Sequence, residues 1–316
     1  MVYRSDAANR AQGVIKMPIN KPIDMLLAID VGGTKIAAAW VSKGQIIERR
    51  QQPMATDPAG FMEAINQLVS GWPAPERVAV AATGYIDGGK VYSVNQHIIE
   101  FWDGFPLGSH LNTRFACPVV LMNDGQAAAW GEYLIRKNSI SSSAPESLLF
   151  ITLSTGVGGG LVLNQQLRIG RQGLAGHVGH TTISRGPVDG DVCCGCGRSD
   201  CLEKVASGTA LARQASAVFG RRIDSRELFA MAQNNPEAES IIDNAAMAVA
   251  EAISNFQMML DVDEIVIGGS VGLADGMLQR IRQALAQAPT LAQVPVTAAL
   301  LGADAGLAGI MQWSQD

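Results

Sequence analysis

The sequence lacks any long apolar run, and no stretch approaches the ~20 consecutive residues that a membrane-spanning helix needs. Near its amino end it also lacks the apolar core and small-residue cleavage site of a secretory signal peptide. Positive charge is not in excess, because 24 Lys and Arg face 29 Asp and Glu, for a net charge of −5. That balance argues against a nucleic-acid-binding surface. We therefore expect a cytoplasmic protein with neither a membrane nor a nucleic-acid partner.

Two common nucleotide-binding signatures are also missing. The chain contains no Walker A motif, and no dinucleotide G-x-G-x-x-G fingerprint in its strand-to-helix setting. Instead, residues 154–160 (STGVGGG) lie between two apolar β-type runs at 148–153 and 161–163. Such a segment can form a tight turn whose backbone N–H groups approach an anion. Taken alone, it is more typical of an ordinary Gly-rich hairpin.

A second copy of this plan lies near the start of the chain. A strand at 26–29, a small-residue turn at 30–35 and strands at 36–41 and 45–49 match the order found from 148 to 169. The repeat predicts a duplicated domain. Two such turns facing one another across a cleft could hold a polyphosphate from both sides.

The remaining segments alternate between helical and strand patterns, which predicts an α/β fold with mixed sheets. A length of 316 residues, 47% of them hydrophobic, is enough for two domains with a core each. Residues 1–24 show no period and are expected to be a disordered extension, too short for a helix-turn-helix domain. The Ser- and Pro-containing stretch 138–146 is expected to link the domains. Helices are predicted at 58–70, 107–115, 125–137, 203–219, 225–233, 236–260, 274–287 and 304–314, and further strands at 77–82, 118–122, 263–267 and 294–300.

Four of the five cysteines lie between 193 and 201, which points to a metal in a reducing compartment more than to disulfides. Cys194, Cys196 and Cys201, with His180 fourteen residues upstream, form a Cys₃His set suited to tetrahedral structural zinc. Cys193 could replace Cys194 as the ligand. The alternative is a group of reduced cysteines that binds no metal.

Two aspartates are candidates for chemistry because each follows an apolar strand, and α/β proteins bind ligands at the carboxyl ends of their strands. Asp124 also starts a predicted helix, whose amino terminus favours the ionised carboxylate. It is a candidate base for phosphoryl transfer, or a simple helix cap. Asp30 could orient a water bound to nucleotide-associated Mg²⁺, or only cap the first turn.

Several segments in order, taken together, resemble the ROK family of repressors, open reading frames and sugar kinases. They are D-x-G-G-T-K at 30–35, N-D at 123–124, S-T-G-x-G-G-G at 154–160, G-H-x-G-H at 176–180 and C-G-C-G-x-x-x-C-x-E at 194–203. The resemblance covers about 25–316. It implies an actin-like (ribonuclease H-like) two-lobed ATPase fold, with an N-terminal lobe at 25–140 and a C-terminal lobe at 141–303 that holds the zinc loop. It also implies that the last helix, within 304–316, packs back on the first lobe, and that the protein is a homodimer.

The resemblance implies a role for each matching residue. The first phosphate turn would be Gly32, Gly33, Thr34 and Lys35, beside Asp30; the second would be Thr155, Gly156, Gly158 and Gly159; and Gly268 and Gly269 would lie by the adenosine of ATP. Asp124 would be the catalytic base on the sugar's 6-hydroxyl group. The sugar would also be bound by Asn95, Asn123, His177, His180 and Glu203. Zinc would be bound by His180, Cys194, Cys196 and Cys201.

One departure from the family pattern bears on the substrate. The usual Gly-Glu-x-Gly-His reads Gly176-His177-Val178-Gly179-His180 here, so a histidine replaces a sugar-binding glutamate. A neutral imidazole offers one acceptor and one donor, and a donor suits an acetamido carbonyl or a differently oriented hydroxyl. His177 could also be a loop histidine that packs beside the zinc.

Segments 173–180 and 268–273 look most like those of bacterial N-acetylmannosamine kinases of sialic acid catabolism. The resemblance therefore implies ATP-dependent phosphorylation of this amino sugar at its 6-hydroxyl. The alternatives are a glucokinase or N-acetylglucosamine kinase of the same family and, from another class, a sugar-responsive repressor.

Overall fold

The computed structural model describes residues 24–94, 99–139, 144–190 and 192–315. It divides into two compact units. The first contains the chain up to Asp124 together with 169–175 and 310–316, and the second contains 125–168 and 176–309. No helix among the described residues is both long enough and apolar enough to cross a membrane.

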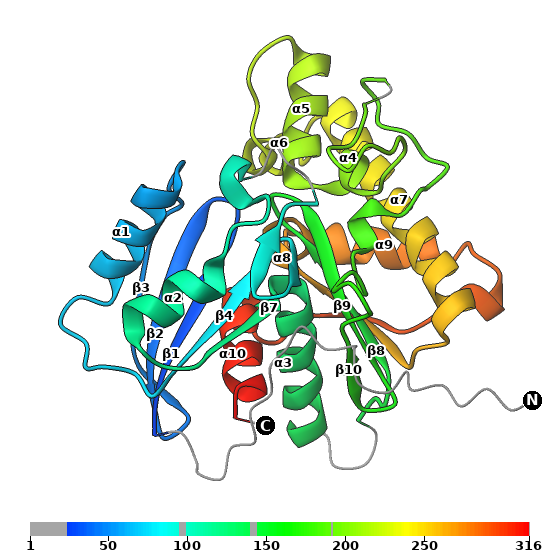
Figure 1. Ribbon diagram of the computed structural model, residues 1–316. Coiled ribbons are helices and arrows are strands. Elements are labelled where there is room, and N and C mark those ends of the chain that lie inside the picture. The colour runs from blue at the N-terminus through cyan, green and yellow to red at the C-terminus, as the bar shows by residue number, and fades with distance from the viewer. Residues whose placement is uncertain (1–23, 95–98, 140–143, 191, 316) are drawn as a thin grey trace, which may run out of the picture. The chain divides into compact units, whose positions relative to one another are not determined.

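The first unit is built on a five-stranded sheet in the order β3-β2-β1-β4-β7 (Figure 1). β1 pairs antiparallel with β2 and parallel with β4, and the small hairpin β5–β6 lies outside this sheet. The strands are β1 (Met25–Val31), β2 (Lys35–Ser42), β3 (Gln45–Pro53), β4 (Arg77–Ala82), β5 (Tyr85–Asp87), β6 (Lys90–Tyr92) and β7 (Val119–Asn123).

Two helices, α1 (Pro58–Leu68) and α2 (Leu107–Phe115), pack on one face of this sheet. α1 begins at Pro58 because Asp57 caps it by accepting from the backbone N–H of Gly60. An aromatic cluster of Phe61, Trp102 and Phe105 fills the core beneath, with ring centroids 5.3–5.9 Å apart. The end of the chain also belongs to this unit, since buried Arg77 donates to the carbonyl of Ser314.

The second unit repeats the plan with the order β10-β9-β8-β11-β12. β8 pairs antiparallel with β9 and parallel with β11, as β1 does with β2 and β4. This correspondence confirms the predicted duplication. The strands are β8 (Leu148–Leu153), β9 (Val157–Leu163), β10 (Gln166–Arg168), β11 (Glu264–Gly268) and β12 (Val296–Ala298).

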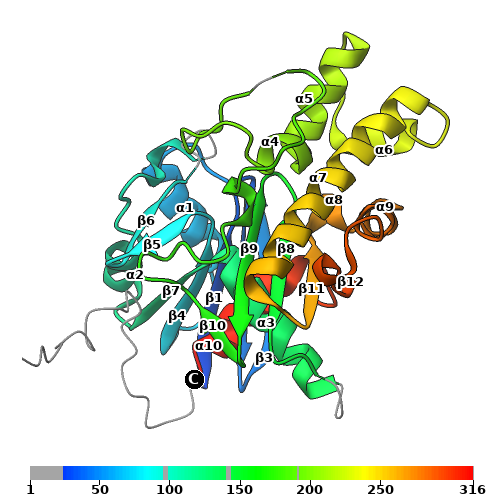
Figure 2. The ribbon, with the colours of Figure 1, turned by 90° about the vertical axis from the view of Figure 1, so that its right-hand side faces the viewer.

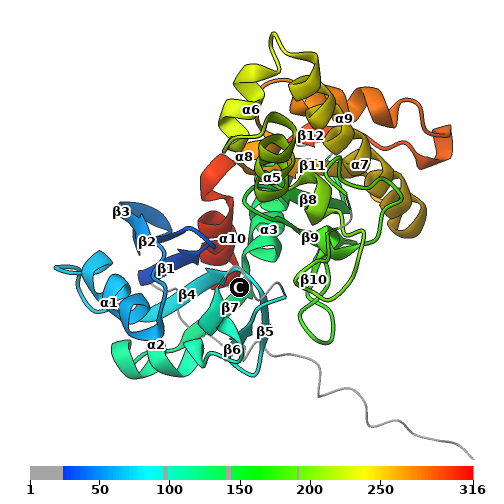
Figure 3. The same ribbon diagram turned by 90° about the horizontal axis from the view of Figure 1, so that it is seen from above.

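The long helix α7 runs across one face of the second sheet with α9 beside it (Figure 2), whereas α3 lies on the other face (Figure 3). The α7 side forms the larger core, built from alternate residues of β8 and β11 and the apolar faces of the helices. The helices are α3 (Asp124–Ser139), α4 (Glu203–Ala206), α5 (Gly208–Phe219), α6 (Ser225–Met231), α7 (Pro236–Leu260), α8 (Gly269–Gly272), α9 (Met277–Leu285) and α10 (Ala305–Trp313).

Two local predictions were wrong. The glycines 158–160 are not part of the turn, because β9 begins at Val157 and pairs Gly158, Gly159 and Gly160 with 152, 151 and 150 of β8. The helix predicted at 203–219 is two helices, broken at Ser207. Its extended ψ of 156° makes Ser207 the cap of α5, where its side chain accepts from the N–H of Ala210.

Candidate functional site

The first glycine turn connects β1 to β2 in the first unit. Its residues 32–34 follow Val31, and the N–H of Gly32 donates to the carbonyl of Lys35 at 3.0 Å. Thr34 and Lys35 are exposed, and Asp30 is half-buried in β1. The turn therefore presents exposed polar groups at the carboxyl end of a central strand, where it was predicted.

The second glycine turn, residues 154–156, connects β8 to β9 in the second unit. It closes on itself because the N–H of Ser154 donates to the carbonyl of Gly156 at 2.9 Å. The carboxylate of Glu203 accepts the next amide, that of Val157, at 3.1 Å. Glu203 is only 6% exposed, so this predicted sugar contact also touches the backbone of the second turn.

Gly268 and Gly269 reach the same end of the second sheet. β11 is the parallel neighbour of β8, and Gly268 pairs with Thr152, two residues before the turn. Gly269 has φ +84°, and a Cβ there would be 2.2 Å from the carbonyl oxygen of Leu153. Only glycine allows this approach, so both predicted adenosine residues lie beside the start of the second turn.

The predicted base, Asp124, is the first residue of α3 and directly follows β7. Buried Asn123 orients it: its side-chain amide donates to Asp124 Oδ1 at 3.0 Å and to the carbonyl of Gly84 at 2.7 Å. Asp124 itself is half-buried. The amino terminus of this 16-residue helix favours a negative charge, so the carboxylate suits a base.

Glycines fix the start of α3 on the second sheet. A Cβ on Gly125 would be 2.5 Å from the carbonyl oxygen of Gly159, and one on Gly160 would be 2.5 Å from that of Gly125. A Cβ on Gly176, just before His177, would be 2.7 Å from the Cα of Gly160. The residue after Asp124, the strand after the second turn and the loop carrying His177 thus meet backbone to backbone.

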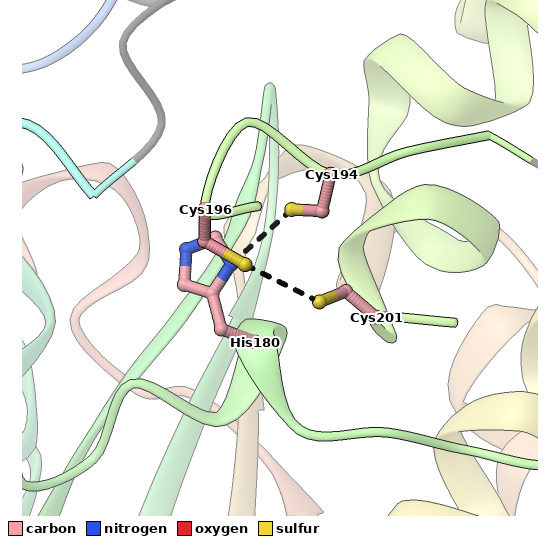
Figure 4. Close-up of side chains that lie close together, drawn as sticks. All are labelled: His180, Cys194, Cys196 and Cys201. Atoms are coloured by element: carbon pink, nitrogen blue, oxygen red, sulfur yellow. Dashed lines mark hydrogen bonds between the residues drawn. The ribbon is translucent and has the colours of Figure 1, made fainter. Parts of the chain in front are cut away.

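The four predicted zinc ligands converge in the second unit, as Figure 4 shows. Their ligand atoms all lie within 4.8 Å of one another. The Nδ1 atom of His180 is 3.4 Å from the Cys194 sulfur, and the sulfurs of Cys196 and Cys201 are 3.6 Å apart. A tetrahedral zinc site with ~2.3 Å Zn–S bonds needs sulfurs about 3.8 Å apart, so the donor set fits the ion. Exposed Cys193 is outside this group, whereas Cys194 is in it.

The surroundings of the cluster suit ligands that share a cation. Burial lowers the pKa of His180, which favours the neutral imidazole that binds metals. Burial raises the pKa of Cys194 and, more strongly, that of Cys201, so these thiols would keep their protons without a nearby positive charge. Arg198 donates to the carbonyl of His180 at 3.1 Å and to the hydroxyl of Thr182 at 3.0 Å, bracing both sides of the loop.

Of two further residues predicted to bind the sugar, the structure describes His177 but not Asn95. His177 is half-buried and directly precedes the short 3₁₀ helix Val178–His180. Asn95 lies outside the described residues. Sequence reasoning missed Gly208 and Thr209, which hold the second turn; the Ser-Gly-Thr sequence at 207–209, a typical cap before a helix, is the signal that could have found them.

Comparison with known proteins identifies the family of this chain. A sequence profile of the ROK family matches residues 26–316. The chain belongs to the ROK family. It is 42% identical over 287 residues to an N-acetylmannosamine kinase of Vibrio cholerae, covering 90% of this chain and 96% of that one. It is 40% identical over 297 residues to the Yersinia pseudotuberculosis enzyme of that name, covering 92% and 98%.

A solved structure of another ROK family member is similar to this chain. The ROK glucokinase of Streptomyces griseus in complex with glucose and AMPPNP matches with a TM-score of 0.76 and 29% identity, covering 92% of this chain and 98% of that one. The predicted family and the predicted actin-like α/β fold are therefore confirmed, as is the assignment to the sugar kinases.

Proposed function

We propose that the protein transfers the γ-phosphoryl group of ATP to the 6-hydroxyl of N-acetylmannosamine. The observation that carries the kinase chemistry is the contact of Gly125 with Gly159 and Gly160, because it fixes the helix of the candidate base on the strand that follows a glycine turn. The choice of sugar rests on relatives of that name at 40–42% identity over at least 90% of this chain.

In this mechanism Asp124 accepts the proton of the attacking hydroxyl as the new O–P bond forms and the bond from the γ-phosphorus to the bridging oxygen of ADP breaks, releasing ADP. Asn123 orients one carboxylate oxygen, and the amino terminus of α3 keeps the group ionised until it takes the proton. We assign sugar hydroxyls to Asn123, Asn95 and Glu203, and an acetamido contact to His177, with His180 beside them. Imidazole can donate to a carbonyl, which a carboxylate cannot do.

We assign the phosphates to the two glycine turns and the adenosine to Gly268 and Gly269. Backbone N–H groups in such turns form concave anion sites. The turn residues assigned to the phosphates are Gly32, Gly33, Thr34, Lys35, Thr155 and Gly156, together with Gly158 and Gly159 of β9, which follow the second turn. Asp30 offers a carboxylate of the kind Mg²⁺ prefers, and this ion would neutralise charge on the transferring phosphate.

We assign structural Zn²⁺ to His180, Cys194, Cys196 and Cys201. Four protein ligands leave no open position, so the metal would stabilise the loop rather than take part in the reaction. Glu203 follows Cys201 by two residues and bonds the second turn. A fixed loop would therefore help to hold both a sugar contact and the turn.

We further infer a cytoplasmic homodimer that acts in sialic acid catabolism. Its N-terminal lobe would be 25–140, its C-terminal lobe 141–303, and its last helix would pack on the first lobe. These assignments are supported by the family resemblance. Size-exclusion chromatography with light scattering tests the dimer, and limited proteolysis tests the boundary near residue 140.

The test of the proposed function is an ADP-release assay with N-acetylmannosamine, N-acetylglucosamine and glucose. We expect the highest kcat/KM with N-acetylmannosamine and a product that carries phosphate on O6. A preference for glucose would favour the alternative supported by the Streptomyces griseus glucokinase. No turnover of any of the three sugars would contradict the proposal.

A further inference from the structure

The second glycine turn is held from outside by the start of α5. The N–H of Gly208 donates to the carbonyl of Ser154 at 2.7 Å. The hydroxyl of Thr209 donates to the carbonyl of Thr155 at 2.8 Å, and the N–H of Thr209 reaches the same oxygen at 3.3 Å. Two consecutive carbonyls of the turn are therefore bonded to two consecutive residues of α5.

These bonds set the direction of two amides. A peptide unit is planar and trans, so the C=O of one residue and the N–H of the next point in opposite directions. Bonding the Ser154 carbonyl to α5 turns the N–H of Thr155 away from that helix, and bonding the Thr155 carbonyl does the same for Gly156. Neither N–H has an acceptor among the residues that the structure describes. The turn thus presents two neighbouring donors, as an anion site requires.

The next amide along the chain, that of Val157, already has an acceptor, so the pair of donors consists of Thr155 and Gly156. Val157 donates to buried Glu203, and a Cβ on Gly156 would be 2.7 Å from that carboxylate oxygen. A side chain at 156 would therefore displace the carboxylate. Glycine here lets Glu203 reach the backbone while the amides of Thr155 and Gly156 face away from α5.

We infer that Thr209 is a positioning residue for the phosphoryl donor, and this rests on the proposed function. Its hydroxyl holds the Thr155 peptide so that the amides of the turn are oriented before a nucleotide phosphate arrives. Thr209 is exposed, so loss of its hydroxyl leaves no buried unpaired group. Removing the hydroxyl should therefore change the orientation of the turn and not the stability of the fold, since no core contact is lost.

The experiment compares Thr209→Val, which removes the hydroxyl at nearly constant shape, with Thr209→Ser, which keeps it. We expect Thr209→Val to lower kcat/KM for ATP about tenfold, below the ~100-fold that a misplacement of 1 Å can cause. ADP affinity, measured by calorimetry, should fall in parallel. The KM for the sugar should stay within about twofold, and Thr209→Ser should restore ATP kinetics to near the parent values.

A matched control lies on the same helix. The hydroxyl of Ser216 donates to the carbonyl of Ala212 at 2.7 Å, away from the turn. Ser216→Ala removes this bond and also the acceptor of the Ile223 N–H at 3.0 Å. The melting temperature should therefore fall, whereas ATP kinetics and ADP affinity should stay unchanged.

The outcomes separate this inference from the proposed function. A parent protein that phosphorylates none of the sugars would contradict the function, while the ADP affinities of the parent and Thr209→Val would still test the positioning role. Parent-like ADP affinity and ATP kinetics in Thr209→Val would overturn the inference. Equal losses in the valine and serine variants, or an equal rise in the sugar KM, would also overturn it.

Discussion

The two units share a sheet plan but hold their glycine turns differently. In the first unit the turn is held by strand backbone, since Gly32 bonds Lys35 and the carbonyl of Thr34 accepts from Met54 at 3.0 Å. In the second unit Gly208 and Thr209 of α5 bond carbonyls of the turn, and Glu203 of α4 bonds the amide of Val157 directly after it. The duplicated turn is thus held by backbone near the strand ends in the first unit and by helix residues in the second.

The difference extends to packing. The second unit places glycines where backbone meets backbone, as at Gly125, Gly160 and Gly269. A Cβ on Gly32 in the first turn would be 3.6 Å from its nearest neighbour, the carbonyl oxygen of Lys35, which is ordinary contact. We therefore expect substitutions in the second unit to affect stability and chemistry together, and those in the first turn to affect nucleotide binding alone.

The largest effect should come from Asp124, where the chain passes from the first unit to the second. Asp124→Asn keeps the shape and the hydrogen bond to Asn123 but removes the base. Because general base catalysis contributes roughly 10²–10⁴-fold, kcat should fall by about that factor. Calorimetry should show sugar and ADP binding close to those of the parent. An unchanged kcat would refute the assigned role and leave α3 as a packing element only.

The next effect concerns zinc, which is assigned to a loop of the second unit. Cys201→Ser removes one of the four converging ligands and should abolish zinc binding, because three ligands no longer close the site. Metal that binds the folded state stabilises it, so the melting temperature should drop by at least about 5 °C, and the KM for the sugar should rise.

The matched control is Cys193→Ser, since Cys193 is exposed and adjacent to the cluster but outside it. This variant should keep its zinc, measured by elemental analysis, and its melting temperature. If elemental analysis found no zinc in the parent protein purified without a chelator, the metal assignment for the whole loop would be contradicted.

The duplicated sheets and the cysteine cluster could be predicted from the sequence because both depend on local patterns. The strand–turn–strand repeat and the cysteine spacing are local signals, and the structure has the duplicated sheets and the four converging side chains. Glycines 158–160 were assigned to a turn because glycine weakens a strand interior. They are strand residues here because α3 packs directly on their backbone, a tertiary contact that no local pattern reveals.

The support of the second turn was missed for a related reason. Residues 203–219 have helical spacing throughout, so the break at Ser207 was not recognised, and with it the placement of Thr209 beside Thr155. The contact joins residues 54 positions apart. Spacing along the chain could identify Glu203 and the turn separately, but it could not show that they touch.

A smaller effect should separate two glycines of β9. Gly160→Ala would bring a Cβ within 2.5–2.7 Å of Gly125, Gln126 and Ala129, whereas on Gly158 the nearest atom is the methyl carbon of Thr152 at 3.4 Å. Overpacking typically costs about 1–3 kcal/mol. Urea unfolding should therefore show a loss of that size for Gly160→Ala and less than about 1 kcal/mol for Gly158→Ala. Equal losses would mean that strand propensity, and not contact with α3, decides the cost.

The smallest effect on stability is expected in the first turn. In Gly32→Ala the added methyl group meets only the Lys35 carbonyl at 3.6 Å, and the backbone at 32 is not in the left-handed region. The free energy of unfolding should change by no more than about 0.5 kcal/mol, as for most substitutions away from packed features. The KM for ATP should nevertheless rise, because the methyl group would occupy space that a phosphate needs. A stability loss as large as that of Gly160→Ala would mean that the first turn is as tightly packed as the second, and the contrast between the two units would fail.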